Sequence, residues 1–262
     1  MNLLVDIGNT AVKCAVTERG EIIAEGRDDR LTVGLLDRLL VGRDVRHAIV
    51  SSTRGDASEV VALVCSRVGH CLEFNQRTPV PIGNAYRSPE TLGLDRLAAA
   101  VGAATLFPGR NVLVIDCGTA LTIDTVTADG VFRGGCISPG LRMRLRALHD
   151  YTAALPLCEP SEWPEPEPNT EPKSVSVRTD AHLGRTTEEA IVRGTVQSIV
   201  FEIEGHAARF RDEFEDTCVI FTGGDAHFFV KRIKNTIFAN CNPVFCGLDR
   251  ILEYNVLEEY LG

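Results

Sequence analysis

Two short turns of the same kind constrain the fold of this chain more than any other feature. Residues 6–10 read Asp-Ile-Gly-Asn-Thr, and residues 116–120 read Asp-Cys-Gly-Thr-Ala. Each turn follows an apolar run and precedes a stretch of alternating or β-branched residues, which predicts a strand, a tight turn and a returning strand. One Asp-x-Gly turn is ordinary hairpin chemistry. The repeat predicts a duplicated domain whose turns can hold phosphates and their cations.

The expected elements follow a similar order in the two halves of the chain. The first half has strands at 2–6, 11–17, 21–25 and 47–51 and helices near 33–41, 56–68 and 90–106. The second half has strands at 111–115, 121–126, 130–134, 218–221 and 243–245, helices near 139–149 and 187–214, and a short last helix. This order predicts an α/β fold of two domains, residues 1–109 and 110–262. Alternating Pro and Glu predict a flexible, solvated loop at 156–173.

Charge and composition exclude several classes of function. The formal net charge of −9 argues against a nucleic-acid-binding protein, which needs a basic surface. Neither a membrane-spanning apolar run nor a secretory signal pattern is present, so we expect a cytoplasmic protein without a membrane partner. The nine cysteines form no Cys-x-x-Cys pair, and we expect reduced, mostly buried thiols rather than a zinc site.

The first turn offers groups that suit a nucleotide. Phosphoryl transfer requires held phosphates, a divalent cation, a positioned acceptor and a base. Asp6 can face a metal ion or its waters, Gly8 allows close backbone approach, and Asn9 and Thr10 are neutral polar contacts. Lys13, on the returning strand, either reaches the phosphates or faces solvent. These groups predict a phosphate site at this turn.

The second turn offers a similar set of groups. Asp116 and Thr119 supply a carboxylate and a hydroxyl, and Gly118 allows close approach of a ligand. Two glycine-rich segments, 134–140 and 222–225, precede expected helices and could present backbone donors or a flat surface to a ligand. The sequence contains no Gly-x-x-x-x-Gly-Lys-Ser/Thr motif, so a P-loop kinase is not expected.

A Gly-Leu-Asp-Arg tetrapeptide occurs twice, at residues 93–96 and 247–250. A carboxylate beside a guanidinium near a helix N-terminus can act as a base next to an anion site, although such pairs also cap helices on the surface. The first copy follows Tyr86 and precedes the second turn, so we assign the chemistry to Asp95. The second copy lies beyond the last expected strand, where we expect a packing helix.

Taken together, these motifs resemble the type III pantothenate kinase family, within the superfamily of acetate and sugar kinases, Hsp70 and actin. The resemblance covers nearly the whole chain and rests on residues 6–10, 78–86, 93–96, 116–120, 134–140, 184–190 and 222–224. It implies two duplicated actin/ribonuclease H-like domains with mixed sheets flanked by helices. It also implies a homodimer that phosphorylates pantothenate to 4′-phosphopantothenate with ATP, the first step of coenzyme A biosynthesis.

The resemblance further implies roles for individual residues. Asp95 would be the general base that takes the proton from the primary hydroxyl of pantothenate, and Asp116 would bind a monovalent cation, K⁺ or NH₄⁺. Mg²⁺ would accompany ATP, which would contact Asp6, Ile7, Gly8, Asn9, Thr10, Ala11, Val12, Lys13 and Thr119. Pantothenate would contact Tyr86, Gly93, Leu94, Asp95, Arg96 and Thr187. The capping-box spacing of Thr186 and Glu189 also explains a Thr pair at that helix start.

Two alternatives stay open from the sequence. Another small-molecule kinase or ATPase of the superfamily would use Asp95 to activate a different hydroxyl or a water. It would hydrolyse ATP equally with and without pantothenate. A catalytically inactive regulatory binding protein of the same fold would be expected to have lost part of the constellation, yet Asp6, Asp95, Arg96 and Asp116 are all present.

Overall fold

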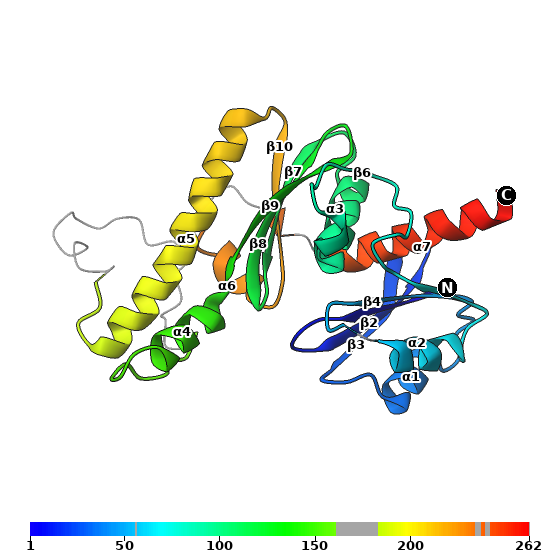
Figure 1. The fold of residues 1–262 in the computed structure, drawn as a ribbon, viewed down its shortest axis with the longest axis horizontal. Helices are drawn as coiled ribbons and strands as arrows, with labels where there is room; N and C mark the ends of the chain where they lie inside the picture. Colours follow the sequence, from blue (N-terminus) through cyan, green and yellow to red (C-terminus); the bar gives the residue numbers. More distant parts are fainter. Residues whose placement is uncertain (56, 161–182, 234–236, 239–241, 262) are drawn as a thin grey trace. The chain divides into compact units, whose positions relative to one another are not determined.

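The computed structural model describes residues 1–55, 57–160, 183–233, 237–238 and 242–261, which form two mixed sheets with helices packed on them (Figure 1). The chain divides into two compact units. Unit 1 comprises Met1–Val114, Asp124–Gly135 and Ala239–Gly262, and unit 2 comprises Ile115–Ile123 and Cys136–Phe238. Among the described residues, no helix has the length and apolar character that crossing a membrane requires.

The first sheet lies in unit 1 and has the strand order β3-β2-β1-β4-β5. Its strands are β1 (Asn2–Ile7), β2 (Val12–Glu18), β3 (Glu21–Asp28), β4 (His47–Ser52) and β5 (His70–Glu73). The first three strands pair antiparallel, whereas β4 pairs parallel with both β1 and β5. The helices α1 (Val33–Leu40) and α2 (Ser58–Cys65) supply the crossover connections that parallel strands need.

The two faces of this sheet have different coverings. One face carries Leu3, Val5 and Ile7 of β1, which pack with the leucines of α1 in an apolar core. Alternate residues of a strand point to opposite faces, so Asp6 lies on the other face. That face is covered by α3 (Leu94–Leu106) and α7 (Pro243–Leu261). Figure 1 shows α1 and α2 on one side of the sheet and α7 on the other.

The second sheet repeats the strand order of the first. It consists of β6 (Gly83–Asn84), β7 (Asn111–Cys117), β8 (Ala120–Thr127), β9 (Val131–Pro139), β10 (Thr217–Thr222) and β11 (Ile237–Phe238). The order is β11-β10-β7-β8-β9-β6, so β7 to β11 without β6 match β1 to β5 position by position. The expected duplicated α/β fold is therefore confirmed. Its remaining helices are η1 (Pro89–Thr91), α4 (Leu141–Asp150), α5 (Thr187–Glu213) and α6 (Ala226–Val230).

The backbones of α3 and α7 touch where they cross. A Cβ added at Gly102 would lie 1.9 Å from the carbonyl oxygen of Pro243, and one added at Gly247 would lie 1.8 Å from that of Ala98. Only glycine fits such an approach. This packing makes α7 part of unit 1. The compact units therefore differ from residues 1–109 and 110–262. The boundary between the duplicated halves stays a prediction.

The strand expected at residues 243–245 is wrong, because α7 begins there. Pro243 occupies the first helical position, where its missing N–H costs nothing and its fixed φ suits the helix. The Asn242 side-chain oxygen accepts a hydrogen bond from the Val244 N–H at 3.0 Å, as a capping residue does. A short apolar run after proline can be read as either element.

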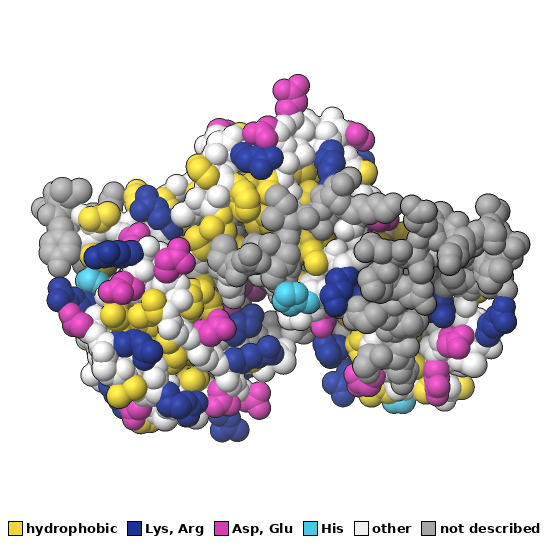
Figure 2. Space-filling view, turned by 180° about the vertical axis from the view of Figure 1, so that it is seen from behind, with side chains coloured by type: hydrophobic (Ala, Val, Ile, Leu, Met, Phe, Trp, Pro, Cys, Tyr) yellow, Lys and Arg dark blue, Asp and Glu magenta, His cyan; other side chains and the backbone are white. Residues whose placement is uncertain are grey.

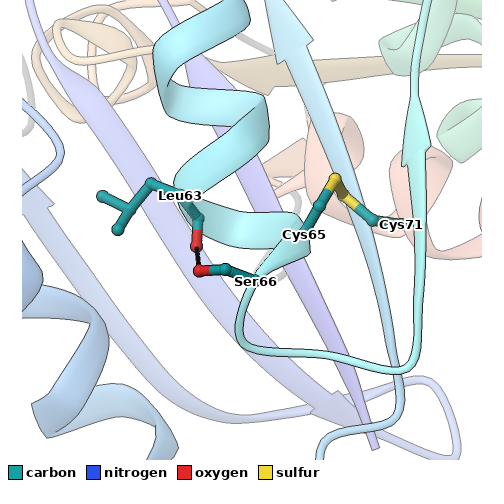
Figure 3. The surroundings of a disulfide bond; sticks show 4 residues. All are labelled: Leu63, Cys65, Ser66 and Cys71. Atoms are coloured by element: carbon teal, nitrogen blue, oxygen red, sulfur yellow. Dashed lines mark hydrogen bonds between the residues drawn. A yellow bond between two sulfur atoms is a disulfide. The ribbon is translucent and has the colours of Figure 1, made fainter.

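Two further expectations need correction. The strand expected at 130–134 is longer, because β9 runs through most of the glycine-rich segment and ends at Pro139. The cysteines are not all reduced, because Cys65 at the end of α2 and Cys71 on β5 form a disulfide, with Cα atoms 5.2 Å apart (Figure 3). Sequence spacing alone does not reveal that a helix end and a strand meet there. The expected loop at 156–173 lies, from residue 161 on, outside the described residues.

Candidate functional site

The first turn presents its tip to solvent and its carboxylate to the interior. The Gly8 N–H donates to the Ala11 carbonyl at 3.1 Å and closes the turn. Asn9 and Thr10 are exposed at its tip. Ile7, Ala11 and Val12 are buried and anchor the turn to the sheet. Backbone and polar groups at this tip are thus accessible to a ligand.

Asp6 is a buried carboxylate, and one of its oxygens has no hydrogen bond among the described residues. Its side chain is 5% exposed, and its Oδ1 atom has no hydrogen-bond partner among the described residues. Burial raises its pKa to about 6, an effect that the charge of Lys13 opposes and that of Asp95 reinforces. Lys13 is its register partner on β2. A bound cation would compensate such a carboxylate directly.

The first Gly-Leu-Asp-Arg copy forms the start of α3. Gly93 is the N-cap residue, and Asp95 lies half-buried in the first helical turn. The Asp95 carboxylate accepts a hydrogen bond from the Arg96 N–H at 2.8 Å. Because its charge reaches Asp6, the structure brings two of the predicted site carboxylates into one neighbourhood of unit 1.

Arg96 is buried and fully engaged. Its Nε donates to the Asp124 carboxylate at 3.0 Å, and its Nη2 also bonds Asp124. The guanidinium carbon lies 5.5 Å from the centre of the Tyr86 ring and 5.8 Å from that of Phe132. Burial by itself would lower the pKa of Arg96, but the hydrogen bonds and charge of Asp124 raise it above its ordinary value.

Asp124 is the partner of a predicted site residue and was not predicted from the sequence. It lies on β8 among apolar neighbours and is 3% exposed. A charged residue inside a buried strand needs a partner of opposite charge. The occurrence of Asp124 in such a strand is therefore the sequence feature that could have pointed to it. This feature names no partner, because the partner Arg96 lies on a helix in the other half of the sequence.

The second copy of the tetrapeptide lies on a packing helix, as expected. Asp249 is buried on α7 and accepts hydrogen bonds from Thr17 Oγ1 at 2.7 Å and Asn2 Nδ2 at 2.8 Å. It ties α7 to the same sheet face that carries Asp6. Both polar partners are on the sheet, so this carboxylate is satisfied within the chain.

The second turn, in unit 2, is also closed by a hydrogen bond from its glycine, but it is tighter than the first. The Gly118 N–H donates to the Ala120 carbonyl at 3.1 Å, and Thr119 is exposed at the tip. Asp116 lies near the end of β7, as Asp6 does on β1. Gly223, with φ of +95°, packs so closely that a Cβ there would lie 2.4 Å from Asp116 Oδ1.

Thr187 lies at the first position of α5 in unit 2 and is exposed. The capping box beside it is confirmed, because Thr186 Oγ1 accepts from the Glu189 N–H at 3.2 Å. The Glu189 carboxylate reaches back to the Arg185 N–H at 2.8 Å. The Thr187 side chain takes no part in these two capping hydrogen bonds.

The predicted site residues therefore fall into two groups. Unit 1 holds residues 6–13, Tyr86 and residues 93–96. Unit 2 holds Asp116, Thr119 and Thr187. Within the described part of the chain, no three His, Cys, Asp or Glu side chains are grouped to hold a metal ion. A cation bound here would rely on one or two carboxylates and on ligand phosphates, as Mg²⁺ commonly does.

Comparison with known proteins gives one family. The sequence model of the type III pantothenate kinase family matches residues 2–209. A type III pantothenate kinase of Bacteroides fragilis is 39% identical over 97% of this chain and 98% of its own length. Those of Phocaeicola vulgatus and Porphyromonas gingivalis are 36% and 38% identical, each over 97% of this chain and 99% of their own.

Solved structures share the fold at low sequence identity. A Campylobacter jejuni protein assigned to the Baf family of transcriptional activators is 19% identical, with a TM-score of 0.59 over 97% of this chain and 99% of its own. The activator of the 2-hydroxyisocaproyl-CoA dehydratase from Clostridium difficile is 16% identical, with a TM-score of 0.52 over 99% of this chain and 96% of its own. These likenesses support the two-sheet α/β fold.

Proposed function

Because this chain belongs to the type III pantothenate kinase family, we propose that it transfers the γ-phosphoryl group of ATP to the primary hydroxyl of pantothenate. The observation that carries the proposal is that two predicted site carboxylates lie in the same neighbourhood of unit 1. Asp6 is buried beside the first turn, and Asp95 lies at the start of α3 close enough to shift its pKa. One carboxylate suits the cation of a nucleotide, and the other suits a general base.

The first turn is the proposed nucleotide site. The exposed Asn9 and Thr10, the backbone at Gly8 and the nearby Lys13 would contact the phosphates. The unpartnered Asp6 Oδ1 fits a hydrated Mg²⁺, which would neutralise charge on the phosphates when bound. The exposed Thr119 of unit 2 is the proposed second contact to ATP.

Asp95 is the proposed general base. Its carboxylate would take the proton of the pantothenate hydroxyl as that oxygen bonds to the γ-phosphorus and the bond from phosphorus to the ADP oxygen breaks. Its side chain is half-buried, so one part remains open to an acceptor. The hydrogen bond from the Arg96 N–H holds the carboxylate in place at the helix start.

Tyr86 and residues 93–96 form the proposed acceptor site in unit 1, with Thr187 as the contact from unit 2. The Tyr86 ring lies against the Arg96 guanidinium, so these two side chains form one surface. Asp124 neutralises part of the Arg96 charge. We therefore propose that Arg96 acts on the substrate mainly by fixing Tyr86 and the start of α3.

Asp116 is the proposed monovalent-cation ligand. Its carboxylate lies near the end of β7, next to the backbone of Gly223. The carboxylate oxygens would be ligands for K⁺ or NH₄⁺. We expect activity to depend on one of these ions. The measurement is ADP release in Na⁺ buffer before and after addition of KCl or NH₄Cl.

We also propose a homodimer, and a cytoplasmic location where ATP is produced. Exposed large apolar side chains on unit 2 support self-association. Phe201 on α5 is 66% exposed and Met143 on α4 is 44% exposed. Figure 2 shows one face of the molecule, on which hydrophobic side chains lie exposed between acidic and basic ones. Light scattering on the wild type and on Phe201→Glu tests this, with the dimer expected only for the wild type.

The test of the proposed reaction compares ADP release with and without pantothenate. The proposal predicts release that requires pantothenate. Equal release in both samples would instead support an ATPase or a kinase with another acceptor. Nucleotide binding without any release, under all cation conditions, would support a regulatory binding protein of the same fold.

A further inference from the structure

A second buried polar side chain lies next to Asp6 and has no role in the account above. Ser51 is on β4, the parallel neighbour of β1, and it is 0% exposed. Asp6 and Ser51 are register partners in that pair. Register partners on neighbouring strands have side chains on the same face, with the strands about 4.8 Å apart. Lys13, Asp6 and Ser51 therefore form one polar row across the face covered by α3 and α7.

Neither oxygen of this neighbouring pair is satisfied. Among the described residues, Ser51 Oγ and Asp6 Oδ1 both lack a hydrogen-bond partner. Leaving a buried polar group unsatisfied is costly, so two such atoms side by side are unusual in a folded protein. The pattern points to a bound state in which both atoms are satisfied together.

The next residue on β4 shows what an ordinary serine does here. Ser52 faces the opposite side of the sheet, and its Oγ accepts a hydrogen bond from the Arg54 N–H at 3.2 Å. Its hydroxyl is therefore used within the chain, at the turn that follows the strand. Ser51 has no such use, although it is the more deeply buried of the two.

We propose that Ser51 is a positioning residue of the nucleotide site, whose hydroxyl donates a hydrogen bond to the Asp6 carboxylate when Mg²⁺ and nucleotide bind. The inference rests on the proposed function of Asp6. Ser51 and Asp6 lie side by side on the same face of the sheet, so a side-chain rotation brings the carboxylate within reach of the hydroxyl as an acceptor. The hydrogen bond would hold the carboxylate in the orientation that meets the cation's water shell.

The test is titration calorimetry with the non-hydrolysable ATP analogue AMP-PNP, with Mg²⁺ and with EDTA. In the wild type, Mg²⁺ should tighten binding. In Ser51→Ala, this Mg²⁺-dependent gain should fall roughly tenfold, the size expected for one hydrogen bond to a charged group. Ser51→Thr keeps the hydroxyl and should restore the gain, and Ser52→Ala is the matched control that should keep it.

Thermal unfolding of the ligand-free proteins separates positioning from a purely structural role. Removing an unsatisfied hydroxyl should leave the melting temperature of Ser51→Ala unchanged or raise it. An undiminished Mg²⁺-dependent gain in Ser51→Ala would overturn the proposal whatever its melting temperature, and a lowered melting temperature would then indicate a purely structural role. A wild type whose AMP-PNP binding gains nothing from Mg²⁺, even if the protein still forms 4′-phosphopantothenate, would also overturn the proposal. A wild type that forms no 4′-phosphopantothenate but still gains AMP-PNP affinity from Mg²⁺ would instead count against the proposed function.

Discussion

At the scale of single residues, Asp6 combines a proposed role in nucleotide binding with a cost in stability. Its pKa of about 6 in the folded chain lies above the ordinary 3.8 because burial disfavours the charge. A carboxyl group with a raised folded-state pKa contributes stability that is fully present below about pH 4 and lost as the pH rises to about 6. Near pH 8 the resulting cost is on the order of 3 kcal/mol.

Asp6→Asn should therefore make the ligand-free protein more stable at pH 8 and flatten the pH dependence of its stability between pH 4 and 7. The amide cannot ionise, so no buried charge has to form. Urea unfolding at pH 5 and pH 8 measures this. The same variant should lose Mg²⁺-dependent AMP-PNP binding. A variant with the wild-type pH dependence would show that Asp6 is not the group responsible.

Asp124 makes a second prediction at this scale. Asp124→Ala leaves the Arg96 guanidinium buried without its carboxylate, which should cost about 3–5 kcal/mol in unfolding free energy. The double variant Arg96→Met/Asp124→Leu removes both charges and should recover most of that loss in urea unfolding. Its pantothenate-dependent ADP release should stay low, because Tyr86 and the start of α3 lose their support. Recovery of activity with stability would show that the pair serves packing alone.

At the scale of elements, the crossing of α3 and α7 holds unit 1 together. Gly247→Ala places a methyl group against the Ala98 carbonyl and should destabilise the protein by several kcal/mol, about the upper range for overpacking. Gly205→Ala on α5 is the matched control, because nothing lies within 4 Å of its added Cβ. It should stabilise by about 0.5–1 kcal/mol. Equal effects of the two substitutions in urea unfolding would contradict this packing.

The elements also show what the sequence could predict. The two turns were predicted because strand, turn and strand follow one another locally in the chain. The start of α7 was misread because Pro-Val-Phe fits a strand as well as a helix, and packing on α3 decided the outcome. The partner of Asp124, the position of Ser51 beside Asp6, and the Cys65–Cys71 disulfide depend on contacts between elements. No local pattern contains that information.

At the scale of the whole molecule, duplication explains why the site residues repeat in type. Apart from β6, both sheets have the same strand order, and both β1 and β7 have an aspartate as their second-last residue, followed by a glycine turn. The residues that differ between the halves are those that we propose for the acceptor site. Asp95 and Arg96 belong to unit 1. The second copy of their tetrapeptide lies in the same unit, where Asp249 bonds the sheet and α7 packs on α3.

The two copies of this tetrapeptide allow the most direct test of the central claim. Asp95→Asn and Asp249→Asn make the same chemical change in the same local sequence, and formation of 4′-phosphopantothenate from ATP and pantothenate can be followed by mass spectrometry. We expect Asp95→Asn to abolish product formation while AMP-PNP binding persists. We expect Asp249→Asn to retain product formation, because its amide oxygen can still accept from Asn2 and Thr17. Loss of product in Asp249→Asn with wild-type turnover in Asp95→Asn would contradict the central claim.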